Sequence, residues 1–191
     1  MPAMPKIALS KKRSGWNQLA AAFPTMTVRT APETHGTMAG RFTEAFSYSG
    51  PTESVHIELH AENGKNVYCD RNYTFANLPK NLAGADWVQA ADADSSYSAA
   101  DLMQLTVKGG MTVYVAHDGQ LRCPEWLENQ FQPTDGMLQV NGRSMKIFAH
   151  QSLKRESITL GSNSESRGPK NANTYIVFVN AAPAVQVSDR K

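Results

Sequence analysis

The chain has 191 residues, with 19 Lys and Arg against 17 Asp and Glu. A charged fraction of 19% and a net charge of +2 exclude a highly charged disordered chain. They also exclude a strongly basic nucleic-acid binder, because phosphate contacts need a concentrated positive face. No apolar run approaches the roughly 20 residues that a membrane-spanning helix requires, so neither nucleic acid nor membrane is an expected partner.

The two ends of the chain are expected to lie outside the folded domain. Residues 1–24 are predicted to form an arm with a short helix over Trp16–Ala22, which Ser14 would cap and Pro24 would end. The apolar stretch in this arm is shorter than a typical signal-peptide core, so no signal peptide is predicted. Residues 183–191 are interpreted as a flexible tail, which leaves residues 25–182 as one domain.

From residue 25 onward the hydrophobic period is two, which is typical of β-strands. The clearest case is SVHIELHA, residues 54–61, in which apolar and polar side chains alternate strictly. Further strands are predicted at Thr25–Thr30, Phe42–Tyr48, Tyr73–Phe75, Trp87–Ala90, Met137–Val140, Met145–His150, Ser157–Leu160 and Thr174–Val179. The only other helix is expected over Pro124–Asn129, with Pro124 at its first position.

Two turn signals predict hairpins. Asn63-Gly64 suits the positive-φ positions of a type I′ turn and would join strand 54–61 to the apolar segment that begins at Val67. Gly109-Gly110 would join LMQLTV to MTVYVA in the same way. Many short strands with turns between them predict an all-β fold, an antiparallel β-sandwich or jelly roll with a short N-terminal helix or arm.

Two groups of side chains invite a metal hypothesis. His56, Glu58 and His60 share one strand face, but the outer pair is too far apart to close a site alone, and a solvated polar face explains them better. A second group, Asp92, Asp94 and Asp101, could bind calcium through carboxylate oxygens or could serve Asx-type turns. The EF-hand spacing and its closing Glu are missing, and no metal or other cofactor is predicted.

Catalytic motifs are missing from the sequence. There is no GxSxG turn, no GxGxxG or GxxxxGK[ST] phosphate loop, and no cysteine beside a histidine. An active site assembled from dispersed residues stays open, but the residues favour a protein without catalytic activity. The two cysteines, Cys69 and Cys123, lack zinc-binding spacing and could either form one intrachain disulfide or remain free thiols.

Aromatic residues are the more suggestive group for ligand binding, because a sugar stacks its C–H face on an aromatic ring. Tyr97, Tyr114 and Trp126 are candidate contacts of this kind. Large aromatic side chains in a sandwich usually belong to the core, and that interpretation is favoured for Trp87 and Trp126.

Six stretches occur in a familiar order: VYCDRNYTF (67–75), LAGADWVQAADADSSY (82–97), LTVKGGMTVYVAHDG (105–119), PEWL (124–127), ITLGSN (158–163) and TYIVFVN (174–180). Residues 67–180 thereby resemble a β-sandwich accessory module found mostly in secreted bacterial polysaccharide lyases and other carbohydrate-active proteins. Ser162 and the two cysteines depart from that pattern.

The resemblance implies a non-catalytic, carbohydrate-binding-like accessory domain with a polysaccharide partner and an extracellular or periplasmic location. His117 and Asp118, in the turn after a core strand, join Tyr97, Tyr114 and Trp126 as candidate ligand-binding residues. An ion pair of Asp70 with Arg71 would orient a strand start. The alternative is a structural or protein-interaction sandwich without a sugar ligand. Neither the oligomeric state nor the glycan follows from the sequence.

Overall fold

A computed structural model of the chain describes residues 39–163 and 172–182. The predicted N-terminal arm with its helix, the predicted strand Thr25–Thr30 and the predicted tail lie outside these residues, as does the predicted domain boundary at residue 25.

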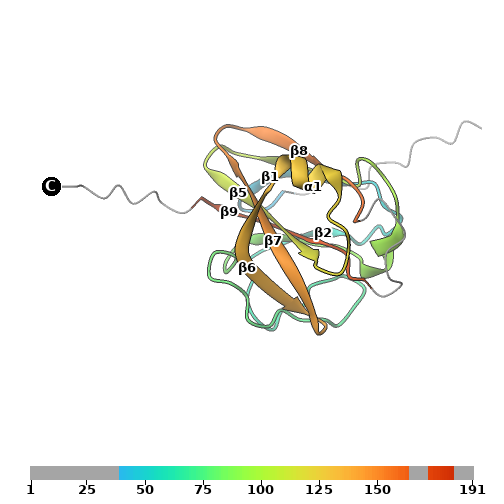
Figure 1. The fold of residues 1–191 in the computed structure, drawn as a ribbon. Helices are drawn as coiled ribbons and strands as arrows, with labels where there is room; N and C mark the ends of the chain where they lie inside the picture. The colour runs from blue at the N-terminus through green and yellow to red at the C-terminus, as the bar shows by residue number, and fades with distance from the viewer. Residues whose placement is uncertain (1–38, 164–171, 183–191) are drawn as a thin grey trace, which may run out of the picture. The chain divides into compact units, whose positions relative to one another are not determined.

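The described residues form two antiparallel sheets with very little helix, which confirms the predicted all-β sandwich (Figure 1). The smaller sheet has the order β1-β4-β8, with β1 at Thr43–Tyr48, β4 at Met103–Val107 and β8 at Glu156–Leu160. The larger sheet has the order β2-β3-β9-β5-β7-β6. Its strands are β2 His56–Glu58, β3 Asp86–Gln89, β9 Ile176–Ala181, β5 Met111–Asp118, β7 Arg143–Ser152 and β6 Gln132–Val140.

Strand β5 lies at the centre of the larger sheet and is buried on both faces. Val115 and its neighbour Ala116 point to opposite faces, and neither has accessible surface. On one face, β8 of the smaller sheet approaches β7, where His150 contacts Glu156 at 3.0 Å. Burial on both faces permits apolar residues on both, as in the apolar run Val113–Ala116 of β5.

The other face of the larger sheet is covered by the long connection between β2 and β3. Phe75 of this connection places its ring 5.6 Å from Phe178 of β9 and 5.5 Å from Trp87 of β3, between ring centroids. Tyr68 of the same connection donates a 2.6 Å hydrogen bond to the carbonyl oxygen of Thr174. The core therefore has two parts, one on each side of the larger sheet.

The predicted hairpin at Asn63-Gly64 is wrong. Strand β2 is only three residues long and pairs with β3, not with the segment after residue 67. His60 has a positive φ of 60°, so the chain leaves the extended conformation two residues after β2 ends. The predicted strand at 73–75 is reduced to an isolated bridge between Asn66 and Thr74.

The predicted hairpin at Gly109-Gly110 is also wrong, because β4 belongs to the smaller sheet and β5 to the larger one. The two glycines instead carry the chain from one sheet to the other. Gly110 has a φ of +81°, and a methyl group on Gly109 would lie 2.8 Å from the carbonyl oxygen of Leu153. The turn therefore needs glycine both for its backbone conformation and for its close packing.

A long hairpin is formed by β6 and β7 and crosses the front of the view in Figure 1. Asn141 and Gly142 at its turn have φ values of 50° and 70°, as a type I′ turn requires. Strand β6 is the edge of the larger sheet, and its register shifts between Pro133 and Met137. An isolated bridge from Ala76 reaches the outer side of β6 at Gln139.

The predicted helix near residue 124 is confirmed as α1, Glu125–Gln130, but Pro124 stands at the N-cap with an extended backbone and not at the first helical position. A short 3-10 helix, η1, spans Asp92–Ser96. In the part of the chain that the structure describes, no helix combines the length and the hydropathy needed to cross a membrane.

Candidate functional site

The C-terminal end of β5 holds two buried polar side chains that point to opposite faces of the sheet. Nε2 of His117 lies 2.9 Å from the carbonyl oxygen of Asn163, and it donates in the tautomer that carries hydrogen on Nε2. Burial lowers the pKa of His117 below its usual value of 6.5. Because the imidazole is 2% exposed, its neutral form is favoured.

Asp118, on the other face, has no accessible surface and joins three separate segments of the chain. One carboxylate oxygen accepts hydrogen bonds from Nη1 of Arg143 and from the backbone N–H of Asn173, both at 3.1 Å. The other accepts the backbone N–H of Gln120 at 3.0 Å. This arrangement supplies the hydrogen bonds that a buried charge needs to be tolerated.

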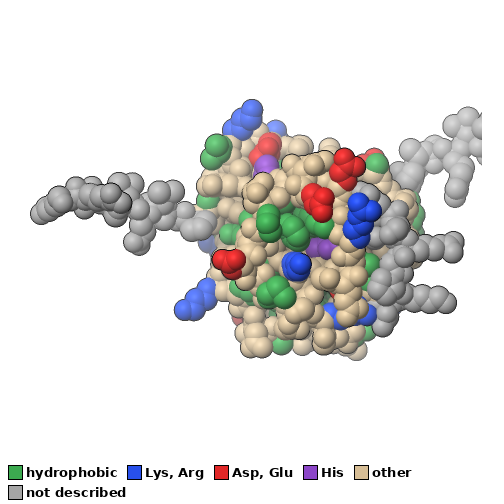
Figure 2. Space-filling view, viewed as in Figure 1, with side chains coloured by type: hydrophobic (Ala, Val, Ile, Leu, Met, Phe, Trp, Pro, Cys, Tyr) green, Lys and Arg blue, Asp and Glu red, His purple; other side chains and the backbone are tan. Residues whose placement is uncertain are grey.

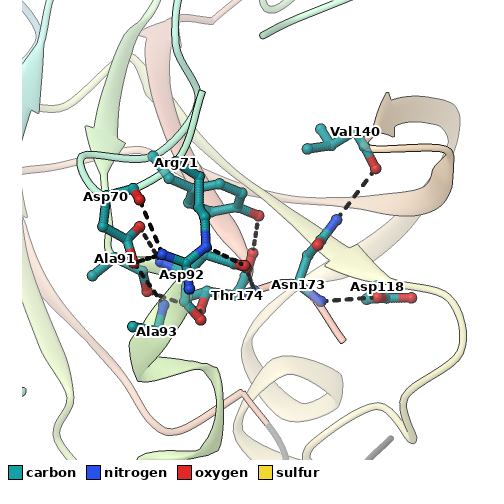
Figure 3. A network of polar contacts seen from close by, with 10 residues as sticks. Asp70, Arg71, Ala91, Asp92, Ala93, Asp118, Val140, Asn173 and Thr174 are labelled. Carbon is teal, nitrogen blue, oxygen red and sulfur yellow. Dashed lines mark hydrogen bonds and ion pairs between the residues drawn. The ribbon is translucent and has the colours of Figure 1, made fainter. Parts of the chain in front are cut away.

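A second set of carboxylates lies beside the first, as Figure 3 shows. Asp70 accepts the backbone N–H groups of Asp92 and Ala93 at 2.8 and 3.0 Å. Asp92 in turn accepts the N–H of Thr174 at 3.1 Å. Arg71 lies 3.0 Å from Asp70, which confirms the predicted ion pair, and 3.7 Å from Asp92. Desolvation by burial raises the pKa of Asp92 above its usual range.

The aspartates of the calcium hypothesis are used by the fold itself. Asp94 accepts hydrogen bonds from the hydroxyls of Tyr48 at 2.6 Å and Thr52 at 3.0 Å, and Asp101 is exposed. Across residues 39–163 and 172–182, no three His, Cys, Asp or Glu side chains are grouped so as to hold a metal ion. Hydrogen bonds within the fold therefore engage both Asp92 and Asp94.

The polar face of β2 has the same explanation. Nε2 of His56 lies 3.0 Å from the carboxylate of Glu58, and its Nδ1 lies 2.7 Å from the carbonyl oxygen of Ser54. His60 has left the strand and is exposed. The face is a partly solvated surface with a local contact between His56 and Glu58.

A shallow pocket of about 390 Å³ opens between the loop after β5 and the β6–β7 hairpin. Its lining residues are Gly119, Gln120, Met137, Gln139, Gly142, Arg143, Ser144 and Lys146. They include two cations and three uncharged polar side chains but no acidic side chain. The side chain of Met137 is 46% exposed, and Nε2 of Gln139 donates to the hydroxyl of Ser144 at 2.5 Å.

The wider surface combines apolar and charged side chains. Figure 2 shows a small group of hydrophobic side chains reaching the surface near the middle of this face, with basic and acidic side chains around it. No large patch of one charge dominates the view.

The candidate ligand-binding residues fall into two classes. Tyr114, His117 and Asp118 are 5%, 2% and 0% exposed, so the fold already surrounds them. Tyr97 and Trp126 are half-buried. Direct contact of these five residues with a ligand remains a prediction. Of the five, Tyr97 and Trp126 have the larger accessible surface.

Trp126 is packed against one end of the sandwich. Its ring centroid lies 5.3 Å from that of Tyr175, and its Nε1 donates to the carbonyl oxygen of Ser162 at 2.9 Å. A methyl group on Gly161 would lie 2.7 Å from Cδ1 of the indole. Trp87 is 2% exposed, which confirms that it belongs to the core.

The two cysteines are free thiols in this structure, and both are half-buried. Burial raises the pKa of both thiols. The hydroxyl of Ser54 donates a 3.4 Å hydrogen bond to Sγ of Cys69. The charge of Glu128 raises the pKa of Cys123 further, and that of Lys146 lowers it. Of the two alternatives that the sequence leaves open, the Cys69–Cys123 disulfide stays untested.

Sequence reasoning missed the pocket and its two cations, Arg143 and Lys146. The pocket forms only when the loop after β5 meets the β6–β7 hairpin, and those segments are separated in the sequence. The dipeptide Asn141-Gly142 between two alternating segments is the signal that could have located the hairpin. It would have placed Arg143 and Lys146 at the start of its second strand.

No protein-family model matches the chain. The chain is 31% identical over 134 residues to a β-glucuronidase of Formosa agariphila, a match that covers 70% of this chain and 14% of that protein. A solved structure of a β-glucuronidase from glycoside hydrolase family 2 matches with a TM-score of 0.69 and 31% identity, over 71% of this chain and 14% of that one. The chain thus spans about one seventh of the length of the relatives it matches. These findings relate it to a β-sandwich part of a carbohydrate-active protein, and not specifically to the polysaccharide lyases.

Proposed function

We propose that the chain is a non-catalytic accessory domain that recognises a polysaccharide. The observation that carries this proposal is the 31% identity to a segment that makes up only 14% of a β-glucuronidase. A segment of this size is one part of a larger carbohydrate-active protein. Association with polysaccharide lyases and export from the cell, which the motif resemblance implies, belong to the proposal as well.

The use of the buried carboxylates supports a role without catalysis. Glycoside hydrolysis needs two carboxyl groups on either side of a sugar bond. Asp94 and Asp118 are instead held by donors of the fold, and Asp86 accepts the backbone N–H groups of Phe42 and Thr43 at 2.6 and 3.1 Å. These groups stabilise the loops around the sheet ends rather than facing an open cleft.

The proposed contact surface uses the half-buried aromatic residues. Trp126 presents part of its indole beside Ser162. Tyr97 lies two residues before Ala99, whose carbonyl oxygen accepts the N–H of Ser162. Trp126 therefore borders the segment 161–163 directly, and Tyr97 lies close in sequence to Ala99, which contacts that segment. His117, which contacts the carbonyl oxygen of Asn163, would hold this segment in place, whereas Tyr114 and Asp118 would serve the interior of the fold rather than touch the glycan.

Affinity electrophoresis of the full chain in gels that contain soluble glycans tests the proposal. The expected result is slower migration with at least one neutral or acidic polysaccharide, and a smaller shift for Tyr97→Ala and Trp126→Ala. Leu153→Ala is the matched control, because Leu153 is an apolar side chain, 85% exposed, in the turn between β7 and β8. Unchanged migration on every glycan would contradict the proposal and favour the structural or protein-interaction role, which light scattering would then examine.

A further inference from the structure

We infer that the pocket between the loop after β5 and the β6–β7 hairpin is a subsite for a carboxylate-bearing sugar, such as a uronic acid residue. The inference rests on the proposed function and narrows it from polysaccharides in general to acidic ones. It follows from the charges, the rigidity and the size of the pocket.

The charged side chains that line the pocket are both positive. Arg143 and Lys146 line it, and no acidic side chain does. The partner of Arg143, Asp118, has no accessible surface, whereas the Arg143 side chain is 11% exposed. The charge of Arg143 is therefore partly compensated by a buried carboxylate, and Lys146 carries the exposed positive charge. Guanidinium groups bind carboxylates through charge-assisted hydrogen bonds.

Arg143 is also held in a fixed position. Its Nη1 donates to Asp118 at 3.1 Å and to the side-chain oxygen of Gln120 at 2.8 Å. Both contacts engage Nη1 and hold the guanidinium beside the loop after β5. A cation fixed in this way loses little conformational entropy when it binds a ligand.

Lys146 supplies the second charge. It lies on β7 directly opposite Met137 of β6 and is exposed. Among residues 39–163 and 172–182 it makes no ion pair, unlike Arg143. The ammonium group therefore offers its hydrogen-bond donors and its charge to a ligand rather than to the protein.

The remaining lining suits a sugar ring. A volume of about 390 Å³ lies within the range of roughly 300–1,000 Å³ that is usual for small-molecule sites. Gln139 and Ser144 provide hydroxyl and amide groups that pair with sugar hydroxyls. Met137, 46% exposed, provides an apolar surface for the C–H face of the ring.

Affinity electrophoresis with polygalacturonate and with the same polymer after reduction of its carboxyl groups tests the inference. We expect stronger retention of the full chain by the carboxylated polymer, and about tenfold weaker binding for Lys146→Ala, since a charge-assisted hydrogen bond is lost. Lys146→Arg is expected to bind as the wild type does. Lys154→Ala is the control for net charge, because Lys154 is exposed in the β7–β8 turn, far along the sheet from the pocket. A thermal melt of each variant verifies folding.

Two results would overturn the inference while leaving the proposed function intact. One is equal retention by the carboxylated and the reduced polymer, and the other is an equal loss of binding in Lys146→Ala and Lys154→Ala. Failure of the proposed function would look different, because the wild type would then migrate unchanged on both polymers and on a panel of neutral glycans.

Discussion

Buried and half-buried aspartates act in this domain as acceptors for backbone N–H groups, most of them from distant segments. Asp70, Asp86 and Asp118 each accept at least two hydrogen bonds from residues more than one position away. A carboxylate with such partners replaces the ladder hydrogen bonds that irregular loops cannot make. The sheet ends are therefore fixed by side chains as much as by strands.

Asp118→Asn is expected to lower the free energy of unfolding by about 3 kcal/mol, because it leaves the charge of Arg143 without its buried partner. Urea denaturation of the variant and the wild type measures the change. Asp101→Asn, at an exposed aspartate, is the matched control and is expected to stay close to the wild type. If Asp118→Asn lowers the unfolding free energy no more than Asp101→Asn does, the Asp118 network contributes little to stability.

His117 gives a prediction about pH. Its pKa is lowered by burial, so the unfolded chain takes up this proton at a higher pH than the folded chain does. The stability that depends on neutral His117 is fully present above about pH 6.5 and is lost as the pH falls through the lower, folded-state pKa. We expect the unfolding free energy of the wild type to fall between pH 7.5 and 5.5, and His117→Gln to flatten this slope. His60→Gln, at an exposed histidine, serves as the control, and an unaltered slope in His117→Gln would refute the assignment.

At the scale of elements, the positions of the strands were predictable from the sequence, whereas their partners were not. Alternation along one strand is a local property, and it located β1, β3, β5 and β7 to within a few residues. Pairing depends on contacts between distant segments. The local signals Asn63-Gly64 and Gly109-Gly110 therefore predict hairpins that the structure does not contain. The burial of Tyr114 could not be predicted for the same reason, because it follows from the central position of β5 in the sheet, where both faces of the strand are covered.

Gly109→Ala tests the turn that carries the chain between the two sheets. The added methyl group would lie 2.8 Å from the carbonyl oxygen of Leu153 and 3.0 Å from Cα of Lys154, so backbone must move. We expect a loss of stability of about 1–3 kcal/mol, measured by urea denaturation. Lys108→Ala, at the exposed preceding residue, should change the stability much less. A Gly109→Ala variant as stable as the wild type would mean that the turn has room for a side chain.

At the scale of the whole molecule, the buried core formed by residues 39–163 and 172–182 is supplied by residues between Phe46 and Val179. That range lies inside the domain proposed from the sequence, residues 25–182. Its two parts, one on each side of the larger sheet, share strands β5 and β9. We therefore propose that the domain unfolds as one cooperative unit.

A fragment of residues 39–182 is expected to fold without the rest of the chain, because it contains every strand of both sheets described here. Circular dichroism should give a β-rich spectrum and a single thermal transition within a few degrees of that of the full chain. A fragment with no cooperative transition would show that residues outside 39–182 complete the core.

The irregular register of β6 has a consequence for how this domain can be joined to others. Between Pro133 and Met137 the border strand lacks a continuous row of backbone donors and acceptors, and Ala76 already occupies its outer side at Gln139. An incoming extended peptide would find no uninterrupted template there. A protein built from several such modules can therefore hold them at high local concentration without strand exchange between the modules along this border.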